Sequence, residues 1–231
     1  MMRESLLLLH GALGSAAQLQ LLKALLSKHF TVYTLDFSGH GGEPFKSDFS
    51  IAAFADEVLT FLDVNIIEKT HIFGYSMGGY VALHLAKLYP DKIDKIFTLG
   101  TKFDWNPETA EREVKMLKPL KIKEKIPAFA KILKERHEPN DWEELLHKTA
   151  IMMLALGNGG VLKEEDFKNI KHHIIIGIGS EDNMVTLAES QAVAAILPHG
   201  KLLLFSNFKH PIEQIDIITL ADAIELFIKS E

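Results

Sequence analysis

The chain has 231 residues, of which 47% are hydrophobic and 24% charged, so it can bury the core of one α/β domain with an inserted subdomain. Its formal net charge of -6 argues against general binding to nucleic acids or anionic membranes, because neither surface attracts an acidic protein. The absence of cysteine excludes disulfides, thiolate metal sites and a cysteine nucleophile.

The first residues resemble a secretion signal only superficially. A leucine run over residues 6–9 follows Arg3, but Glu4 and His10 bracket it, and a secretory core needs roughly 7–15 apolar residues. No segment approaches the roughly 18 apolar residues of a membrane-spanning helix. We therefore expect a cytoplasmic protein with no membrane association, and the sequence gives no indication of its oligomeric state.

Short apolar or β-branched segments alternate with amphipathic segments along most of the chain. This alternation is typical of a parallel sheet with helices on both faces, so the predicted fold class is α/β. Strands are predicted at residues 6–9, 32–36, 71–73, 95–99, 174–178 and 201–205. Helices are predicted at residues 16–27, 51–65, 76–89 and 187–197, and a C-terminal helix with one apolar stripe is predicted over residues 217–228.

The interval from residue 101 to residue 170 interrupts this alternation. It holds no predicted strand but three predicted helices, one over residues 126–137 between two others. The first of these others starts at Asn106-Pro107, and the second is capped by Asn140, three residues before Glu143. The interval is too long for an ordinary connection, so we interpret it as an inserted helical lid.

With the lid at residues 101–170, the α/β core is assigned to residues 1–100 and 171–231. The lid carries more large apolar side chains than an exposed connection needs. Each of them is a candidate either for lining a pocket or for fastening the lid to the core: Phe103, Trp105, Met116, Leu117, Phe129, Trp142, Met152 and Met153.

The most informative motif is Gly74-Tyr75-Ser76-Met77-Gly78, which lies between the apolar run 71–73 and a helical segment. A serine in this strand–turn–helix context sits on a sharp turn that presents its hydroxyl to a ligand. The flanking glycines fit because a Cβ at either position would collide with a neighbouring strand or helix. The motif predicts a nucleophile elbow with Ser76 as the nucleophile, although alone it also fits a plain βα turn with an incidental serine.

A serine nucleophile needs two partners, which the sequence supplies. A histidine must accept the hydroxyl proton, and a carboxylate must hold that histidine in the right tautomer. In chain order the acid follows the serine and the histidine comes last. Asp182 follows the predicted strand at 174–178, and His210 follows the strand at 201–205. Both therefore belong at the carboxyl edge of the sheet, where open α/β sheets bind ligands.

These motifs together make the chain resemble a serine-dependent member of the α/β-hydrolase superfamily over most of its length. Five matching motifs occur in the family's order, each at the end of a predicted strand: His10 to Gly14, Asp36 to Gly41, Gly74 to Gly78, Gly179 to Asp182, and His210-Pro211. The family's strand hairpin ahead of the His-Gly loop is missing. The resemblance therefore implies an α/β-hydrolase fold with a trimmed parallel sheet of about six strands.

The resemblance also implies an oxyanion hole made of two backbone N–H groups. In the family, one comes from the residue after the nucleophile and the other from the loop after the first of these strands. By position these are Met77 and Ala12. Backbone donors suit the task because they are fixed before the reaction, and the loss of one such donor costs on the order of 10²–10³ in rate.

Other residues compete for roles in the site. Asp104, after the strand at 95–99, is the alternative acid to Asp182, with capping near the start of the lid as its other reading. His10 and His40 are expected to stabilise backbone in their loops. The other histidines apart from His210 have no motif context and are expected to be ordinary surface or core residues: His29, His71, His84, His137, His147, His172, His173 and His199.

No cofactor and no metal are expected. Ser76 stands where a dinucleotide fingerprint requires its second glycine, and the sequence has no His-Glu-x-x-His pattern or clustered ligands. The lysines of the lid are interpreted as a solvated face.

The expected function is a cofactor-free serine hydrolase that cleaves a small carboxylic ester or thioester through an acyl-enzyme. The family's frequent use of this constellation on such substrates implies this class. Cleavage of carbon–carbon bonds, lyase chemistry and perhydrolysis use an identical triad and stay open. So does a ligand sensor that keeps the architecture but turns over little or nothing, because fold and triad fit both.

Overall fold

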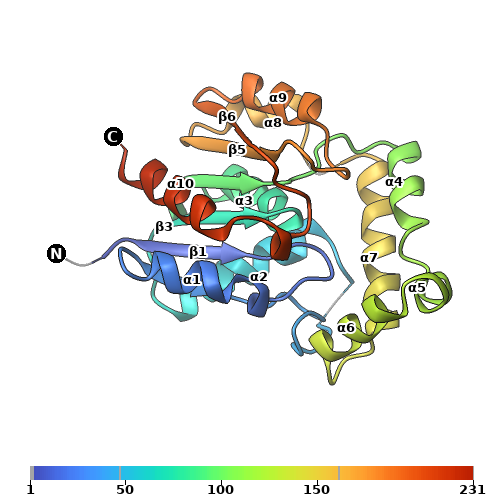
Figure 1. The fold of residues 1–231 in the computed structure, drawn as a ribbon. Helices are drawn as coiled ribbons and strands as arrows, with labels where there is room; N and C mark the ends of the chain where they lie inside the picture. The colour runs from blue at the N-terminus through green and yellow to red at the C-terminus, as the bar shows by residue number, and fades with distance from the viewer. Residues whose placement is uncertain (1–2, 47, 161, 231) are drawn as a thin grey trace.

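Six strands form one parallel sheet in the computed structural model, which describes residues 3–46, 48–160 and 162–230 (Figure 1). The strand order across the sheet is β2-β1-β3-β4-β5-β6. The strands are β1 Ser5–Leu9, β2 Thr31–Thr34, β3 Thr70–Tyr75, β4 Ile93–Leu99, β5 Ile174–Gly179 and β6 Gly200–Phe205. The predicted α/β class and the trimmed parallel sheet of six strands are confirmed.

The leucine run of β1 explains why helices cover both faces of the sheet. Side chains alternate between the two faces of a strand, so an uninterrupted apolar run has to be buried on both. Leu7 and Leu9 pack into one apolar cluster, whereas Leu6 and Leu8 pack into the other. The run therefore lies at the centre of a two-faced core.

Two sets of helices close the two clusters. The set on the Leu7 and Leu9 face comprises α2 Ile51–Val64, α3 Met77–Leu88, α8 Glu164–Asn169 and α9 Leu187–Ile196. The set on the opposite face comprises α1 Gln20–Leu26, preceded by a 3₁₀ turn at Ala16–Leu19, and α10 Ile217–Lys229. Short 3₁₀ turns also occur at Pro90–Lys92 and Ile212–Gln214. No helix in the described ranges is both long and apolar enough to cross a bilayer.

One strand ends earlier than predicted. Residues 35 and 36 were assigned to the second strand, but β2 ends at Thr34, which pairs with Leu8. Asp36 instead turns toward the loop after β1, where its carboxylate accepts a hydrogen bond from the Ala16 N–H (2.7 Å). The side chain thereby joins the two loops that leave β1 and β2 at the carboxyl edge.

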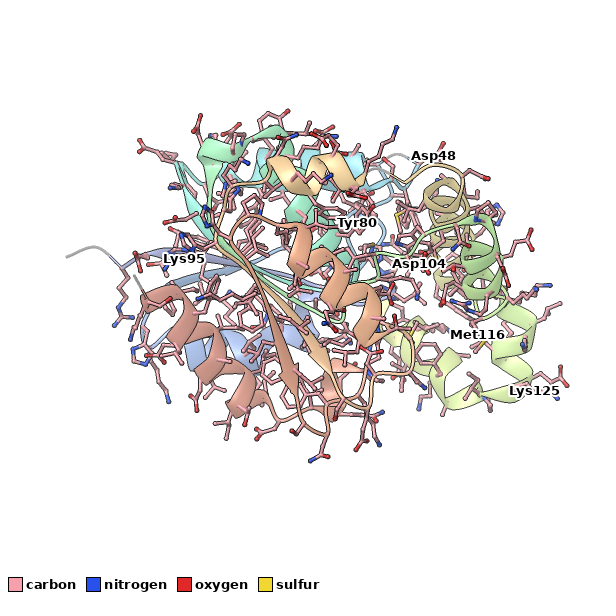
Figure 2. The ribbon with its side chains drawn as sticks, turned by 90° about the horizontal axis from the view of Figure 1, so that it is seen from above. Asp48, Tyr80, Lys95, Asp104, Met116 and Lys125 are labelled. Carbon is pink, nitrogen blue, oxygen red and sulfur yellow. The ribbon has the colours of Figure 1, made fainter. Side chains whose placement is uncertain are left out.

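In the described ranges, five helices rather than three lie between β4 and β5. Four of them, which we call the inserted helices, are α4 Pro107–Val114, α5 Pro119–Lys125, α6 Pro127–His137 and α7 Trp142–Gly157, and the fifth is the core helix α8. Figure 1 shows α4 to α7 gathered beyond one end of the sheet, with α4 packed beside α7. Figure 2 places Met116 and Lys125 at their outer end, away from Lys95 on the core.

The caps of these helices separate correct from incorrect predictions. Asn106 caps α4 as predicted, because its side chain accepts the Thr109 N–H (2.9 Å). The cap predicted at Asn140 is wrong. Asp141 caps α7 by accepting the Glu143 N–H (2.8 Å), whereas the Asn140 amide donates to carbonyls of the 37–43 turn.

Candidate active site

Ser76, Asp182 and His210 lie at the carboxyl edge of the sheet, each in the segment that follows a strand. Ser76 directly follows β3, Asp182 follows β5 and His210 follows β6. Because all strands of a parallel sheet end at the same edge, three distant segments of the chain are brought to one region. This is the edge beyond which the inserted helices lie (Figure 1).

Ser76 occupies the sharp turn between β3 and α3. Its backbone has φ 51° and ψ -117°, a combination that residues with a Cβ rarely adopt and that stores strain. The Ser76 N–H donates to the Leu99 carbonyl (2.8 Å), and the Thr101 hydroxyl donates to the Ser76 carbonyl (3.0 Å). The end of β4 thus holds the strained serine from both sides of its Cα.

Two glycines make room for this turn. A Cβ at Gly74 would lie 2.5 Å from the backbone of Gly79, and a Cβ at Gly78 would lie 2.6 Å from the Leu9 carbonyl oxygen. Both distances are too short for any side chain, which confirms the predicted reason for glycine at these positions. The start of α3 can therefore press directly against the end of β1.

His210 is held by a carboxylate and by the strand that leads to the serine. Its Nδ1 lies 2.8 Å from Oδ2 of Asp182, whose side chain is only 2% exposed. The Tyr75 hydroxyl donates to the His210 carbonyl (2.8 Å), and the centroids of the two rings are 5.6 Å apart. The residue next to Ser76 in the chain therefore fixes the backbone of His210.

The surroundings of Asp182 favour its ionised form. Burial by itself raises the pKa of this carboxyl group, but the hydrogen bond and the charge of His210 lower it. The amide N–H groups of Met184 (2.8 Å) and Val185 (2.9 Å), which donate to Oδ1, lower it further. The net pKa of Asp182 lies below its ordinary value, so the group is an anion where a histidine needs one.

A small cavity opens over Ser76. It has a volume of about 50 Å³, and Ala12, Ser76 and Met77 all line it. The rest of its wall consists of Lys102 and of largely apolar side chains: Ile51, Tyr80, Trp105, Met152, Met153 and Leu156. The predicted nucleophile and both predicted oxyanion residues thus face one apolar space.

The large apolar residues between positions 101 and 170 divide between the two predicted roles. Trp105, Met152 and Met153 line the cavity. Trp142 packs with Leu133 and Leu146 in a small cluster of their own, against which Leu117 and Phe129 lie, while Phe103 packs against the core. Met116 does neither, because it is 60% exposed. Sequence could not distinguish these cases, since a side chain's direction depends on how the helices pack.

Both candidate oxyanion residues line the cavity and lie at turns of the backbone. Met77 is the first residue of α3, so its N–H has no partner within the helix. Ala12 lies in the loop after β1, which the hydrogen bond from the Gly14 N–H to the Gly11 carbonyl (3.0 Å) closes into a turn. The next residue, Leu13, has φ 58°, so this loop is strained like the elbow.

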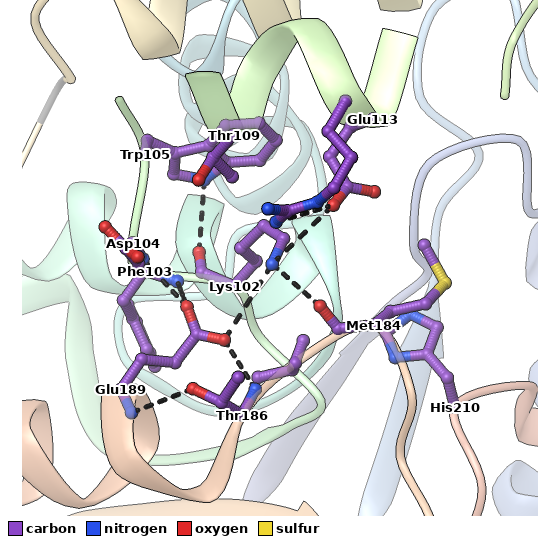
Figure 3. A network of polar contacts seen from close by, with 12 residues as sticks. Lys102, Phe103, Asp104, Trp105, Thr109, Glu113, Met184, Thr186, Glu189 and His210 are labelled. Atoms are coloured by element: carbon purple, nitrogen blue, oxygen red, sulfur yellow. Dashed lines mark hydrogen bonds and ion pairs between the residues drawn. The ribbon is translucent and has the colours of Figure 1, made fainter. Parts of the chain in front are cut away.

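A partly buried ionic cluster supports the Asp182 loop (Figure 3). Lys102 Nζ donates to the Met184 carbonyl (2.7 Å) and lies 3.8 Å from carboxylate oxygens of Glu113 on α4 and Glu189 on α9. Glu189 also accepts the N–H groups of Asp104 (2.9 Å) and Thr186 (2.6 Å). One lysine therefore joins an inserted helix, a core helix and the loop that carries the acid.

Asp104, the alternative acid, has other partners. Its side chain accepts a hydrogen bond from the Asn106 amide (3.2 Å), and its N–H donates to Glu189. Figure 3 shows it on the far side of the ionic cluster from His210. The carboxylate beside His210 is that of Asp182, and Asp104 lies near the start of α4 as its capping interpretation anticipated.

Three buried histidines lie behind the loop of Ala12. His10 and His40 contact backbone, as predicted: His10 Nδ1 donates to the Gly11 carbonyl (2.8 Å) while Nε2 accepts the Phe37 N–H (3.2 Å), and His40 Nδ1 donates to the Ser38 carbonyl (3.0 Å). Burial lowers the pKa of His10 to about 4 and that of His40 well below its ordinary value. Both rings are therefore neutral structural groups.

His137 is the functional candidate that sequence reasoning missed. It is the last residue of α6, is fully buried, and contacts the loop of Ala12 through the Leu13 carbonyl. Burial also lowers its pKa to about 4. No local signal marks it, because its hydrogen-bond partners lie about a hundred residues away in the chain.

A metal centre has no counterpart among the residues that the structure describes. No group of three or more His, Asp or Glu side chains there is arranged to hold an ion. The polar groups at the carboxyl edge instead suit proton transfer around a hydroxyl.

Comparison with known proteins identifies relatives of the whole chain and of its first half. The sequence family described as "alpha/beta hydrolase fold" matches residues 4–120. An uncharacterized protein of Mycobacterium bovis is 34% identical over 97 residues, which cover 42% of this chain and 28% of that protein. A pimeloyl-acyl-carrier-protein methyl ester esterase of Aliivibrio salmonicida is 23% identical over 226 residues, which cover 90% of this chain and 85% of that enzyme.

Solved structures share the architecture at low sequence identity. The enol-lactonase of Burkholderia xenovorans superposes with a TM-score of 0.78 at 20% identity, covering 100% of this chain and 93% of that one. At this identity the likeness bears on the fold alone. It agrees with the six-stranded parallel sheet and the helices on both of its faces.

Proposed function

The chain belongs to the α/β-hydrolase fold family, and from this premise we propose that it is a serine hydrolase of carboxylic esters or thioesters. One observation carries the proposal. Ser76, Ala12 and Met77 line a single cavity, and Tyr75, the neighbour of Ser76 in the chain, donates to the carbonyl of a histidine whose Nδ1 lies 2.8 Å from a buried carboxylate. A nucleophile, two backbone donors and a paired histidine are the parts that acyl transfer needs.

In the proposed mechanism each residue has one role. The Ser76 hydroxyl attacks the carbonyl carbon of the ester, and His210 takes up the hydroxyl proton through Nε2. Asp182 accepts the Nδ1 proton in a hydrogen bond and stabilises the imidazolium that forms. The amides of Ala12 and Met77 hold the oxyanion of the tetrahedral intermediate. Protonation of the leaving alcohol or thiol by His210 leaves an acyl-serine.

Water then completes the reaction. His210 removes a proton from a water molecule, which attacks the acyl-serine carbonyl, and the same two amides hold the second oxyanion. Collapse of this intermediate releases the carboxylic acid and returns the proton to Ser76. No cofactor or metal takes part in either half of the proposed cycle.

The cavity favours a small, uncharged acyl group. Its volume is about 50 Å³ and its wall is mostly apolar. Lys102 is the charged group on the wall, but Glu113 and Glu189 face its ammonium, so it does not offer a free positive charge to an anionic acyl tail. The name of the Aliivibrio relative, a methyl ester esterase, supports ester cleavage. A small-molecule ester or thioester is therefore the proposed substrate.

The inserted helices supply part of that wall and are proposed to act as a lid over a core formed by residues 1–100 and 171–231. Trp105 precedes α4, and Met152, Met153 and Leu156 belong to α7. Changes in these side chains are expected to alter the substrate range without altering the chemistry at Ser76.

A fluorophosphonate probe and a short-chain aryl ester test the proposal. We expect one probe per chain at Ser76 and measurable turnover of the ester, with both abolished in Ser76→Ala. A matched control is Ser15→Ala, which removes a buried serine in the neighbouring loop. If the wild-type chain is neither labelled nor active while it binds small ligands, the ligand sensor is the correct interpretation.

A further inference from the structure

The segment that ends α6 fastens the inserted helices to two loops of the core. Arg136, His137 and Asn140 each make hydrogen bonds to distant backbone there. The Asn140 amide donates to the carbonyls of Gly39 (3.2 Å) and Glu43 (2.6 Å) in the turn after β2. This part of the insertion is therefore attached to the core.

Arg136 bridges the loop of Ala12 and the loop of His210. Its Nη1 donates to the Leu13 carbonyl (3.0 Å), and its Nη2 donates to Oε1 of Glu213 (3.0 Å). Leu13 follows Ala12, and Glu213 lies in the 3₁₀ turn that follows His210-Pro211. A guanidinium is planar and rigid, so its two nitrogens fix the separation of the groups that they bind.

His137 adds a second donor to the same carbonyl. Its Nε2 lies 3.1 Å from the Leu13 carbonyl oxygen, and its Nδ1 accepts the N–H of Gly41 (3.1 Å). Accepting at Nδ1 and donating at Nε2 requires the neutral ring with its proton on Nε2. The ring is fully buried, so solvent does not compete for either bond.

These contacts act on a strained peptide. Leu13 has φ 58°, a left-handed conformation that is strained for a residue with a Cβ. Two donors on its carbonyl oppose relaxation of the loop, and the same loop carries Ala12, which lines the cavity over Ser76. A shift of about 1 Å in such a donor is enough to lose much of its effect on a transition state.

We propose that Arg136 and His137, on the inserted helix α6, are positioning residues that hold the loop of Ala12 and the loop of His210 in a fixed relative position. The proposal rests on the proposed function, because it assigns the Ala12 N–H to the oxyanion. It makes the end of α6 a fixed part of the catalytic framework, although neither side chain is assigned a contact with substrate.

Kinetics of Arg136→Met test this role, because methionine keeps the apolar stem and removes both donors. We expect kcat per active site, counted by fluorophosphonate titration, to fall at least about tenfold, while KM stays within about twofold of the wild type. The loss should be smaller than the 10²–10³-fold loss in rate that follows when an oxyanion donor is removed altogether. Arg136→Lys, which keeps one donor, should lie between. Arg112→Met is the matched control, since Arg112 lies on α4 and is 62% exposed; its kcat should not change.

Amide hydrogen exchange tests the same proposal without turnover. In Arg136→Met, exchange of the amides of residues 11–15 should be at least tenfold faster than in the wild type, and Arg112→Met should leave it unchanged. The positioning role is wrong if Arg136→Met alters neither exchange nor kcat. It is also wrong if the main effects of the variant are a higher KM and a lower free energy of unfolding. Absence of labelling and turnover in the wild type would refute the proposed function, and exchange would still decide whether Arg136 holds the loop.

Discussion

At the scale of single residues, the decisive contact is the one between Asp182 and His210. Asp182→Asn keeps the shape of the side chain but replaces an anion with an amide that favours the wrong tautomer of the histidine. We expect kcat for an aryl ester to fall by about 10⁴. The rate at which a fluorophosphonate labels Ser76 should fall in parallel, because the same proton transfer activates the serine in both reactions.

Asp104→Asn is the control for this prediction. Asp104 is the alternative acid, because it also follows a predicted strand, but its side chain contacts Asn106 rather than His210. Its replacement should leave kcat within about twofold of the wild type, as for surface changes remote from the chemistry. Equal losses in the two variants would contradict the assignment of Asp182 as the acid.

At the scale of elements, Lys102 joins α4, α9 and the loop of Asp182. Its side chain is 12% exposed, and those of Glu113 and Glu189 are 13% and 7% exposed. Lys102→Met leaves two carboxylates facing each other without the cation between them. We expect a loss of about 2 kcal/mol in the free energy of unfolding, measured by urea denaturation, because removal of the cation leaves two partly buried carboxylates without a counter-charge.

An exposed ion pair calibrates that measurement. Lys69 lies 3.4 Å from Asp94, with both side chains about half exposed, so Lys69→Met should cost less than about 1 kcal/mol. The double variant Lys102→Met/Glu113→Gln should recover part of the loss, since one of the two carboxylates is then neutral. A loss for Lys102→Met no larger than that for Lys69→Met would refute the role of the cluster.

The elements also show what could be predicted from the sequence and why. The strands and the elbow were predictable because apolar runs and glycines are local signals. The positions of Asp182 and His210 followed from topology, since every parallel strand ends at one edge. The division of the inserted segment into five helices was not predictable, because the lysine-rich stretch of α5 carries no clear apolar stripe.

Contacts across the chain were beyond sequence reasoning for a different reason. The hydrogen bond from Arg136 to Leu13 joins residues 123 positions apart, and only the packed insertion brings them together. The prediction of the Asn140 cap failed similarly, because the side-chain NH₂ of Asn140 donates to carbonyls of the turn after β2, a tertiary contact that no local signal marks. The assignment of residues 101–170 as a lid and the catalytic roles themselves remain predictions.

At the scale of the whole molecule, three neutral buried histidines make folding sensitive to acid. The folded pKa values of His10 and His137 are about 4, and that of His40 is also lowered, against about 6.5 in the unfolded chain. Between these values the unfolded state binds more protons. The stabilisation is complete above about pH 6.5 and is lost as the pH falls toward 4, at about 1.4 kcal/mol per pH unit for each histidine.

Urea denaturation at pH 7, 6 and 5 measures this dependence. His137→Asn should reduce the pH slope of the unfolding free energy by one histidine's share, whereas His147→Asn, at an exposed position on α7, should leave the slope unchanged. An unfolding free energy that does not change between pH 7 and 5 would contradict the neutral state of the buried rings.

The crossover from β4 to β5 has a consequence for how such a chain diverges. Two adjacent parallel strands require a connection that passes over one face of the sheet, and α8, which packs Phe167 into the core, already makes that passage. Helices α4 to α7 are thus an addition to a βαβ unit that is already complete without them. Side chains of these helices that contact neither the core nor the ionic cluster can therefore change, and alter which substrates fit, without disturbing strand register, provided that Arg136 and His137 keep their hydrogen bonds to the core loops.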